Sequence, residues 1–293
     1  MSTPEAFEID VDLPDPSFDE EAATLLGFDA RYARVEKQLR IISAADDVRA
    51  WASKQYGAKP PPIVKLISGQ YPLFVMEGDV GTGKTAFARG AASRLCKSLK
   101  KEGRFFALST RVRGSGRVGE ASTRINEAFD YVAEQLGRNR LVFLLIDEAD
   151  SLLTARSDAH NHLEDRVAVN TIIQKVDDLR RHGGRLVVVL ATNRIDSLDA
   201  AILRRIAIHE TFERPNEEER FELLRSDLAG LGFADATIKA FAKKTGGSPG
   251  YTYSDFRTRL LPRVVAMAFP DRVIQEGDVL SAIQAVKPSP VVS

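Results

Sequence analysis

The chain has 293 residues, of which 44% are hydrophobic and 28% charged, and its 41 basic and 41 acidic residues leave no formal net charge. This ordinary composition excludes a disordered, collagen-like or coiled-coil protein as a description of the whole chain, and the charge balance argues against bulk nucleic-acid binding. The single cysteine excludes an intrachain disulfide and a cysteine-rich zinc site; with no apolar run long enough to cross a membrane, we expect a protein of the reducing cytoplasm.

The N-terminal stretch is strongly acidic. Its first 21 residues hold eight acidic residues, three prolines and no lysine or arginine. Such a composition predicts an extended or flexible tail, which we place at residues 1–24. The apolar side chains of Phe7, Ile9 and Val11 alternate with polar ones and leave room for a strand that docks on a sheet.

The middle of the chain alternates between short apolar runs and segments of helical spacing. This alternation predicts an α/β fold with a doubly wound parallel sheet, and the runs Leu141–Ile146 and Leu186–Leu190 are typical of strands buried on both faces. After Pro215 the strand signal stops and several helices are expected up to Val286. The expected strands are Leu73–Met76, Phe105–Leu108, Leu141–Ile146, Leu186–Leu190 and Ala207–Phe212, and the expected helices before Pro215 are Ala30–Tyr56, Thr85–Lys97, Ala121–Leu136 and Ala168–Arg181.

A glycine-rich loop follows the first of these strands and opens a helix. Residues 78–85 read G-D-V-G-T-G-K-T, which fits the phosphate-binding pattern G-x-x-x-x-G-K-[ST] in the strand–loop–helix context that the pattern requires. In such a loop the backbone wraps a phosphate, the lysine reaches the β and γ phosphates, and the last hydroxyl holds Mg²⁺. We therefore expect a nucleotide to be bound by Gly78, Asp79, Val80, Gly81, Thr82, Gly83, Lys84, Thr85 and Ala86.

Polar side chains follow two other expected strands. Asp147, Glu148 and Asp150 come directly after Leu141–Ile146, at the edge of the sheet where open α/β proteins bind ligands. We expect Asp147 to hold Mg²⁺ with Thr85, and Glu148 to polarise the attacking water as general base. Asp150 is a weaker candidate that fits a helix cap. Asn193, after the next strand, is expected to position the water near the γ-phosphate.

These elements, in this order and before a helical region, resemble those of the AAA+ ATPases over residues 25–286. The resemblance implies a large α/β ATPase domain at 25–214, a small all-helical lid domain at 215–288 and a C-terminal tail at 289–293. It implies ATP and Mg²⁺ as cofactors. The segment Gly27-Phe28-Asp29 resembles the one that contacts adenine in that family, which gives Phe28 that role.

The resemblance also implies arginine roles. Residues 250–256 resemble the small-domain element that carries the sensor-2 arginine in some members, but Ser254 stands at the matching position, and Arg257 and Arg259 remain open alternatives. Leu203-Arg204-Arg205-Ile206 matches the place of the arginine finger, with Arg205 preferred to Arg204. A finger completes the active site of a neighbouring subunit, so it implies a ring, usually a hexamer.

A narrower resemblance runs through residues 144–156 and 165–170. These segments are similar to the pachytene-checkpoint type of AAA+ ATPase, which includes the thyroid-receptor-interactor enzymes that remodel HORMA-domain proteins. The short chain resembles bacterial members encoded with HORMA proteins and second-messenger synthases in antiphage defence. The implied function is an ATP-hydrolysing ring that remodels or disassembles a HORMA-domain partner. The substrate-gripping pore loop is expected at 111–120, with Arg117 and Val118 at its tip, and a second channel loop at 157–163.

Two alternatives stay open. A DNA-associated AAA+ ATPase, such as a transposition or replication loader, would use Arg111, Arg113 and Arg117 on phosphates. DNA is disfavoured as a partner, because the sequence lacks a helix-turn-helix signature and aromatic residues interleaved for base stacking. A scaffold that binds nucleotide without hydrolysis is disfavoured by four intact residues, Lys84, Asp147, Glu148 and Arg205.

Overall fold

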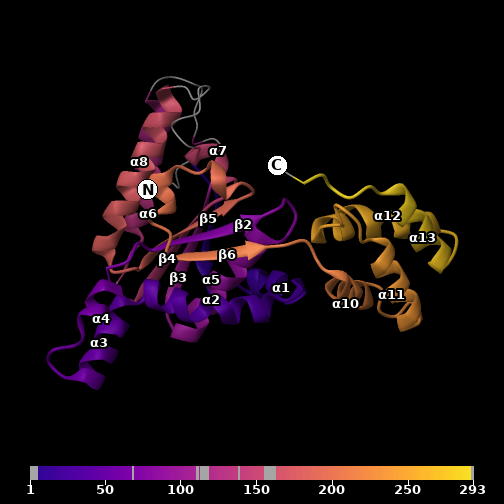
Figure 1. Cartoon of the computed structure of the whole chain (residues 1–293), viewed down its shortest axis with the longest axis horizontal. Coiled ribbons are helices and arrows are strands. Elements are labelled where there is room, and N and C mark those ends of the chain that lie inside the picture. Colours follow the sequence, from indigo (N-terminus) through magenta and orange to yellow (C-terminus); the bar gives the residue numbers. More distant parts are fainter. Residues whose placement is uncertain are drawn as a thin grey trace. The chain divides into compact units, whose positions relative to one another are not determined.

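The computed structural model describes residues 6–67, 69–109, 112, 119–137, 139–154 and 163–291, which form two compact units (Figure 1). The first, the sheet unit, consists of Met1–Ala23, Phe28–Glu77 and Thr85–Thr211. The second, the helical unit, consists of Thr24–Gly27, Gly78–Lys84 and Phe212–Ser293. The glycine-rich loop therefore belongs to the same compact unit as the C-terminal helices.

The sheet has the strand order β1-β3-β4-β5-β2-β6, and its inner strands β3, β4, β5 and β2 are parallel. Ile146 pairs with Leu190 and Glu77 with Thr192, so the carboxyl ends of β4, β5 and β2 meet at one edge. The strands are β1 Phe7–Leu13, β2 Leu73–Gly78, β3 Glu102–Leu108, β4 Arg140–Ile146, β5 Leu186–Thr192 and β6 Ile208–Phe212.

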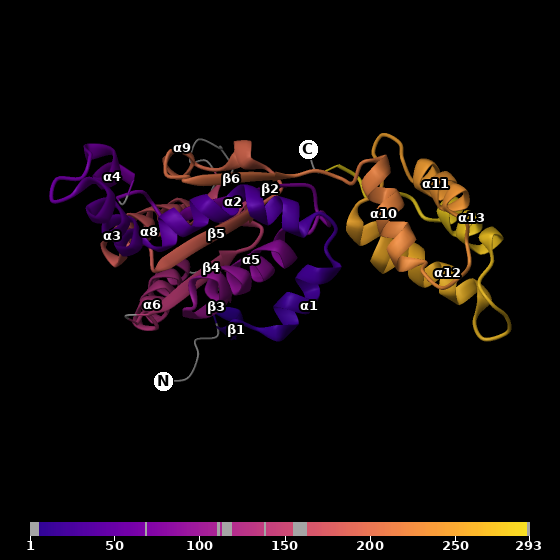
Figure 2. The ribbon, with the colours of Figure 1, turned by 90° about the horizontal axis from the view of Figure 1, so that it is seen from below.

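Helices cover both faces of this sheet, with α6 and α8 on one side and α2 and α5 on the other (Figures 1 and 2). The single helix expected over 30–56 is two helices that meet at Ala44, whose φ of −139° departs from helical geometry. The helices are α1 Pro16–Thr24, α2 Phe28–Ser43, α3 Ala45–Tyr56, α4 Pro62–Ile67, α5 Lys84–Leu99, α6 Glu120–Glu134, α7 Ala149–Leu153, α8 Leu163–Leu179 and α9 Ala200–Leu203.

The N-terminal segment is ordered. The prediction of a flexible tail over 1–24 is wrong for residues 6–24, where β1 pairs antiparallel with β3 and is followed by α1, and the docked strand is confirmed. Asp10 accepts hydrogen bonds from the Nε and Nη2 atoms of Arg104 at 2.5 and 2.8 Å, and Asp12 pairs with Arg140. Two of the acidic residues that suggested a tail are therefore paired with arginines of the sheet unit.

The helical unit is built around α10 Glu217–Asp227, α11 Asp235–Lys244, α12 Leu261–Ala268 and α13 Glu276–Ala285. Asn216 begins α10 as expected, because its side chain accepts from the backbone of Glu219 while the Glu219 carboxylate accepts from the Asn216 N–H, both at 2.9 Å. Its core holds side chains from every helix, among them Leu224, Phe241, Phe256, Leu260 and Val279.

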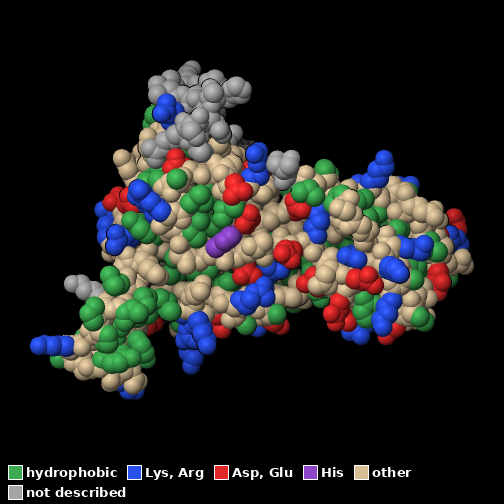
Figure 3. All heavy atoms as spheres, viewed as in Figure 1, with side chains coloured by type: hydrophobic (Ala, Val, Ile, Leu, Met, Phe, Trp, Pro, Cys, Tyr) green, Lys and Arg blue, Asp and Glu red, His purple; other side chains and the backbone are tan. Residues whose placement is uncertain are grey.

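Exposed apolar side chains gather on α3 and α4 (Figure 3). Trp51 and Tyr56 stand edge to face with ring centroids 5.8 Å apart, and both are about half exposed. Ile63 and Leu66 add further exposed apolar area nearby in the sequence. Gatherings of this kind are typical of surfaces that contact another protein.

Candidate functional site

The glycine-rich loop wraps tightly between β2 and α5. Gly78 adopts a φ of +149°, and a Cβ atom there would lie 2.0 Å from the carbonyl oxygen of Phe212, so only glycine fits. The Lys84 side chain is buried and its Nζ donates to the carbonyls of Gly78 at 2.6 Å and Asp79 at 2.9 Å. The loop therefore holds the Lys84 ammonium group beside its own backbone, at the start of α5. A phosphate-binding loop likewise places its positive groups at the N-terminus of a helix.

Thr85 and Asp147 meet directly, although 62 positions separate them. The Thr85 Oγ1 donates to the Asp147 Oδ2 at 2.5 Å, and the Asp147 Oδ1 accepts from the Glu148 N–H at 2.9 Å. The hydroxyl and the carboxylate are the hard oxygen ligands that Mg²⁺ prefers. This pair fits the metal role expected for both residues.

Glu148 is exposed and adopts a left-handed backbone conformation, with φ of 49° and ψ of 46°. Lys100 is the other described residue besides glycine with a positive φ. Side chains other than glycine rarely adopt this conformation, and such strain concentrates at functional sites. The turn from β4 into α7 therefore presents the Glu148 carboxylate to solvent at the carboxyl edge of the sheet.

Asp150 holds the end of the neighbouring strand. Its Oδ1 accepts from Thr192 Oγ1 at 2.9 Å and from the Asn193 N–H at 3.3 Å. Thr192 Oγ1 in turn accepts from the Arg194 N–H at 3.1 Å. Sequence reasoning offered a helix cap for Asp150 and missed this link between the β4 and β5 ends; the acidic residue three positions beyond Asp147 was the available signal.

Arg205 does not face outward. This observation reverses the expected preference for Arg205 over Arg204 as the arginine finger. Its guanidinium is buried, and its Nε and Nη2 each donate to an oxygen of Asp177 at 2.6 Å. Its Nη1 donates to the Ala201 carbonyl at 2.6 Å, and the group lies 5.3 Å from the Tyr71 ring centroid. The neighbouring Arg204 is exposed at the end of α9. A side chain with these partners holds α9 on its own subunit, so Arg204 is the better candidate for a finger.

Two further expected residues are used for packing or pairing. The Phe28 ring is buried, stacks on Tyr32 with centroids 6.0 Å apart, and packs against Phe87. Because the ring is used in packing, the adenine contact expected of Phe28 stays a prediction, and it would involve the backbone of this residue. Arg257 forms two 3.0 Å hydrogen bonds with Asp227 inside the helical unit.

The expected pore loops fall largely outside the described residues. Arg117 and Val118 lie there, as does most of the 157–163 loop. Val112, the one described residue of 110–118, is fully buried. Its side chain belongs to the core of the sheet unit. In the part of the chain that the structure describes, no helix is long and apolar enough to span a membrane, and no group of three or more His, Cys, Asp or Glu residues could hold a metal ion.

Comparison with known proteins agrees with this geometry. The family model of AAA, the ATPase family associated with various cellular activities, matches residues 74–214. A CD-NTase-associated protein 6 of Escherichia coli (strain KTE188) is 45% identical over 295 residues, 99% of each chain. The chain belongs to the AAA ATPase family. This AAA ATPase is therefore a nucleotide-binding enzyme, related over its whole described length to that protein.

Solved structures give the same relationship. A chain in the "Structure of E. coli MS115-1 HORMA:CdnC:Trip13 complex" matches this AAA ATPase with a TM-score of 0.90 and 34% identity, covering 98% of this chain and 97% of that one. The "Structure of Rhizobiales Trip13" matches with a TM-score of 0.73 and 29% identity, covering 97% and 99%. The expected α/β sheet followed by a helical region is thus confirmed as the AAA fold.

Proposed function

We propose that this AAA ATPase is a ring that uses ATP hydrolysis to remodel or disassemble a HORMA-domain protein, and that it regulates a second-messenger system of antiphage defence. The observation that carries the proposal is the match, over nearly the whole chain, to a Trip13-containing complex with a HORMA protein. The name of the E. coli relative, a CD-NTase-associated protein, supports the second-messenger setting. On the sequence grounds given above, we place the activity in the cytoplasm.

The described side chains supply the parts that hydrolysis needs. Lys84 would neutralise the β and γ phosphates, and Thr85 and Asp147 would hold Mg²⁺, whose charge polarises the phosphate when the ion is bound. Glu148 would take a proton from the attacking water, and Asn193, with its backbone fixed by Asp150, would orient that water. Holding these groups in place is most of phosphoryl-transfer catalysis, because the transition state needs positioning and charge stabilisation.

The proposed ring is supported by the arginine at the end of α9. Arg204 lies at the C-terminal end of α9, whose start is capped by Asp199 accepting from the Ala201 N–H at 2.8 Å. A guanidinium on such a fixed turn would reach the phosphate bound by the next subunit. The substrate would be gripped by Arg117 and Val118 in the predicted pore loop.

The test uses the purified chain with a bacterial HORMA-domain protein, and with duplex DNA in a parallel arm. We expect the HORMA protein to raise ATP turnover and to change its own protease sensitivity only when ATP is present. The matched control is Glu148→Gln, which keeps the size of the side chain and should abolish both effects while ATP still binds. Stimulation by DNA and not by the HORMA protein would favour the DNA-associated alternative and contradict the proposal.

A further inference from the structure

Arg214 joins the phosphate loop to the C-terminal segment of the chain. Its Nε donates to the Asp79 Oδ2 at 2.6 Å, and the two side chains are only 13% and 18% exposed. Its Nη1 donates to the carbonyls of Gly250 at 2.6 Å and Ser289 at 2.8 Å, and its Nη2 donates to that of Pro290 at 3.0 Å. One guanidinium therefore fastens two segments of the helical unit, at Gly250 and at Ser289–Pro290, to the second residue of the loop.

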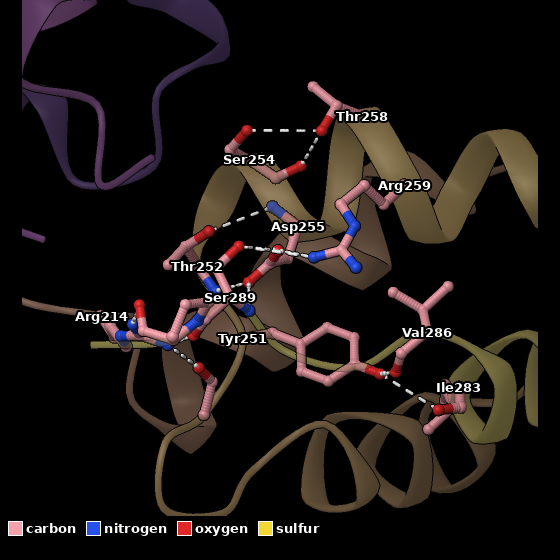
Figure 4. Close-up of polar contacts among 12 residues, drawn as sticks. Arg214, Tyr251, Thr252, Ser254, Asp255, Thr258, Arg259, Ile283, Val286 and Ser289 are labelled. Atoms are coloured by element: carbon pink, nitrogen blue, oxygen red, sulfur yellow. Dashed lines mark hydrogen bonds and ion pairs between the residues drawn. The ribbon is translucent and has the colours of Figure 1, made fainter. Parts of the chain in front are cut away.

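The C-terminal segment is itself held by a buried carboxylate (Figure 4). Asp255 is 1% exposed and accepts from the N–H of Ser289 at 3.0 Å and from its hydroxyl at 2.6 Å. It also accepts from the Thr252 N–H at 3.0 Å and from Arg259 at 2.9 Å. Burial alone would raise the pKa of Asp255, but these hydrogen bonds outweigh it and lower the pKa to about 2. Ser289 and Pro290, which lie in the C-terminal tail predicted at 289–293, are thus fastened to the helical unit.

The segment around Asp255 also contacts the glycine-rich loop, at a second position. The Ser254 N–H donates to the Gly81 carbonyl at 3.1 Å, and a Cβ atom on Gly81 would lie 2.6 Å from the Ser254 Cβ and 2.9 Å from the Thr252 Oγ1. Ser254 stands where related proteins carry a sensor-2 arginine, and here its backbone contacts the loop. The loop is therefore held at Asp79 through Arg214 and at Gly81 through Ser254.

The Arg214 side chain is engaged by the protein itself. Four of its five N–H groups donate to protein oxygens, and the Asp79 carboxylate neutralises its charge. What it can do is restrict the backbone of a glycine-rich loop that is otherwise free to adopt many conformations. A loop that is already held in its binding conformation loses less conformational entropy when it binds nucleotide, and its affinity for nucleotide is therefore higher.

We propose that Arg214 is a positioning residue for nucleotide binding, and that residues 287–291, the C-terminal strap, are a working part of the nucleotide site. The proposal rests on the assignment of residues 78–85 as the phosphate loop. It adds that the position of the strap affects the loop. Breaking the contacts of Ser289 and Pro290 with Arg214 would also weaken the hold of Arg214 on Asp79, and nucleotide affinity would fall.

The test measures the affinity of the full chain for ADP by calorimetry and the KM and kcat for ATP. Arg214→Met removes four hydrogen bonds, so ADP affinity should fall about tenfold or more and the KM for ATP should rise similarly, with little change in kcat. Arg214→Lys, which can keep the Asp79 ion pair but not the fork to the carbonyls, should lose less. A chain ending at Lys287 should weaken ADP binding in the same direction.

The matched control is Arg272→Met. Arg272 also forms an ion pair with two hydrogen bonds in the helical unit, but with Asp278, so its loss should leave ADP affinity within about twofold. The double variant of Arg214→Met and Asp79→Asn should bind ADP no more weakly than the weaker single variant, because both changes disrupt the same Arg214–Asp79 contact.

Three results would overturn the proposal: unchanged ADP affinity in Arg214→Met, equal weakening by Arg272→Met, or additive effects of Arg214→Met and Asp79→Asn. Lys84→Ala separates this failure from failure of the loop assignment. If Lys84→Ala abolishes ADP binding while Arg214→Met does not weaken it, the loop stands and the strap proposal falls.

Discussion

Replacing Arg204 and Arg205 separately tests the assignment of the arginine finger. Arg205→Ala removes the hydrogen bonds to Asp177 and Ala201, whereas Arg204→Ala removes an exposed side chain. The first change should therefore act mainly on the stability of the subunit and the second mainly on catalysis. The two residues are neighbours, so each variant is the control for the other.

The structure sets the size of both effects. A hydrogen bond to a charged group contributes about 1.5–3 kcal/mol. Because the Asp177 side chain is 42% exposed, water replaces part of what is lost, and we take about 2–3 kcal/mol for the whole Arg205 side chain. For a protein of this size that is a fall in Tm of about 4–12 °C. Loss of a finger at Arg204 should lower kcat by about 10³-fold or more with little change in Tm.

The assays are thermal unfolding and ATP turnover, with a mixing experiment. Mixing Arg204→Ala with Glu148→Gln subunits should restore part of the turnover, because some interfaces then pair an intact base with an intact finger. A mass-based measurement of subunit exchange is the control. The reasoning is refuted if Arg205→Ala keeps the Tm of the unchanged protein and loses turnover, while Arg204→Ala keeps full turnover.

Three further outcomes are expected. Glu148→Gly should abolish hydrolysis yet raise Tm by about 2 °C, because glycine adopts the left-handed backbone conformation without strain. Lys100→Gly should give a similar rise in Tm with ATP turnover unchanged. A lower Tm in both variants would show that neither residue is strained. Asp150→Ala should lower kcat without weakening ADP binding, since it frees the backbone of Asn193; equal kcat would remove Asp150 from that role. The pKa of Asp255 falls from 3.8 to about 2 on folding, so its ionised form contributes stability above about pH 4 that is lost as the pH falls through 2; Asp255→Asn should be less stable at pH 7 and show a flatter Tm between pH 4 and 2.

The sequence predicted those parts of the fold and site that depend on local pattern. The apolar runs predicted the inner strands of the sheet. The glycine-rich loop and the acidic end of β4 were recognisable because few other structures require those residue types in that order. The Asn216 cap was predictable for the same reason, since both partners lie within one turn.

The remaining features depend on partners far along the chain. Nothing near Arg205 in the sequence shows that Asp177, 28 positions earlier, takes up its guanidinium. Nothing near Asp10 shows that Arg104 neutralises it. Ser289 and Arg214 are 75 positions apart. Charge and exposure at such positions are set by tertiary contacts. Local sequence therefore does not show which of the two arginines is exposed, that the acidic N-terminal segment docks on the sheet, or that Ser289 is held by the helical unit.

The pairing of β1 with β3 has a consequence during synthesis of the chain. Asp10 emerges 94 residues before Arg104, so at roughly 5–20 residues per second the strand waits about 5–20 s for its partner. An unpaired strand edge is open to pairing with another chain during that time. The negative charges of β1 repel other copies of the same strand until Arg104 and Arg140 arrive to neutralise Asp10 and Asp12. The acidity of this segment thus protects the nascent chain from misassembly before it becomes part of the sheet.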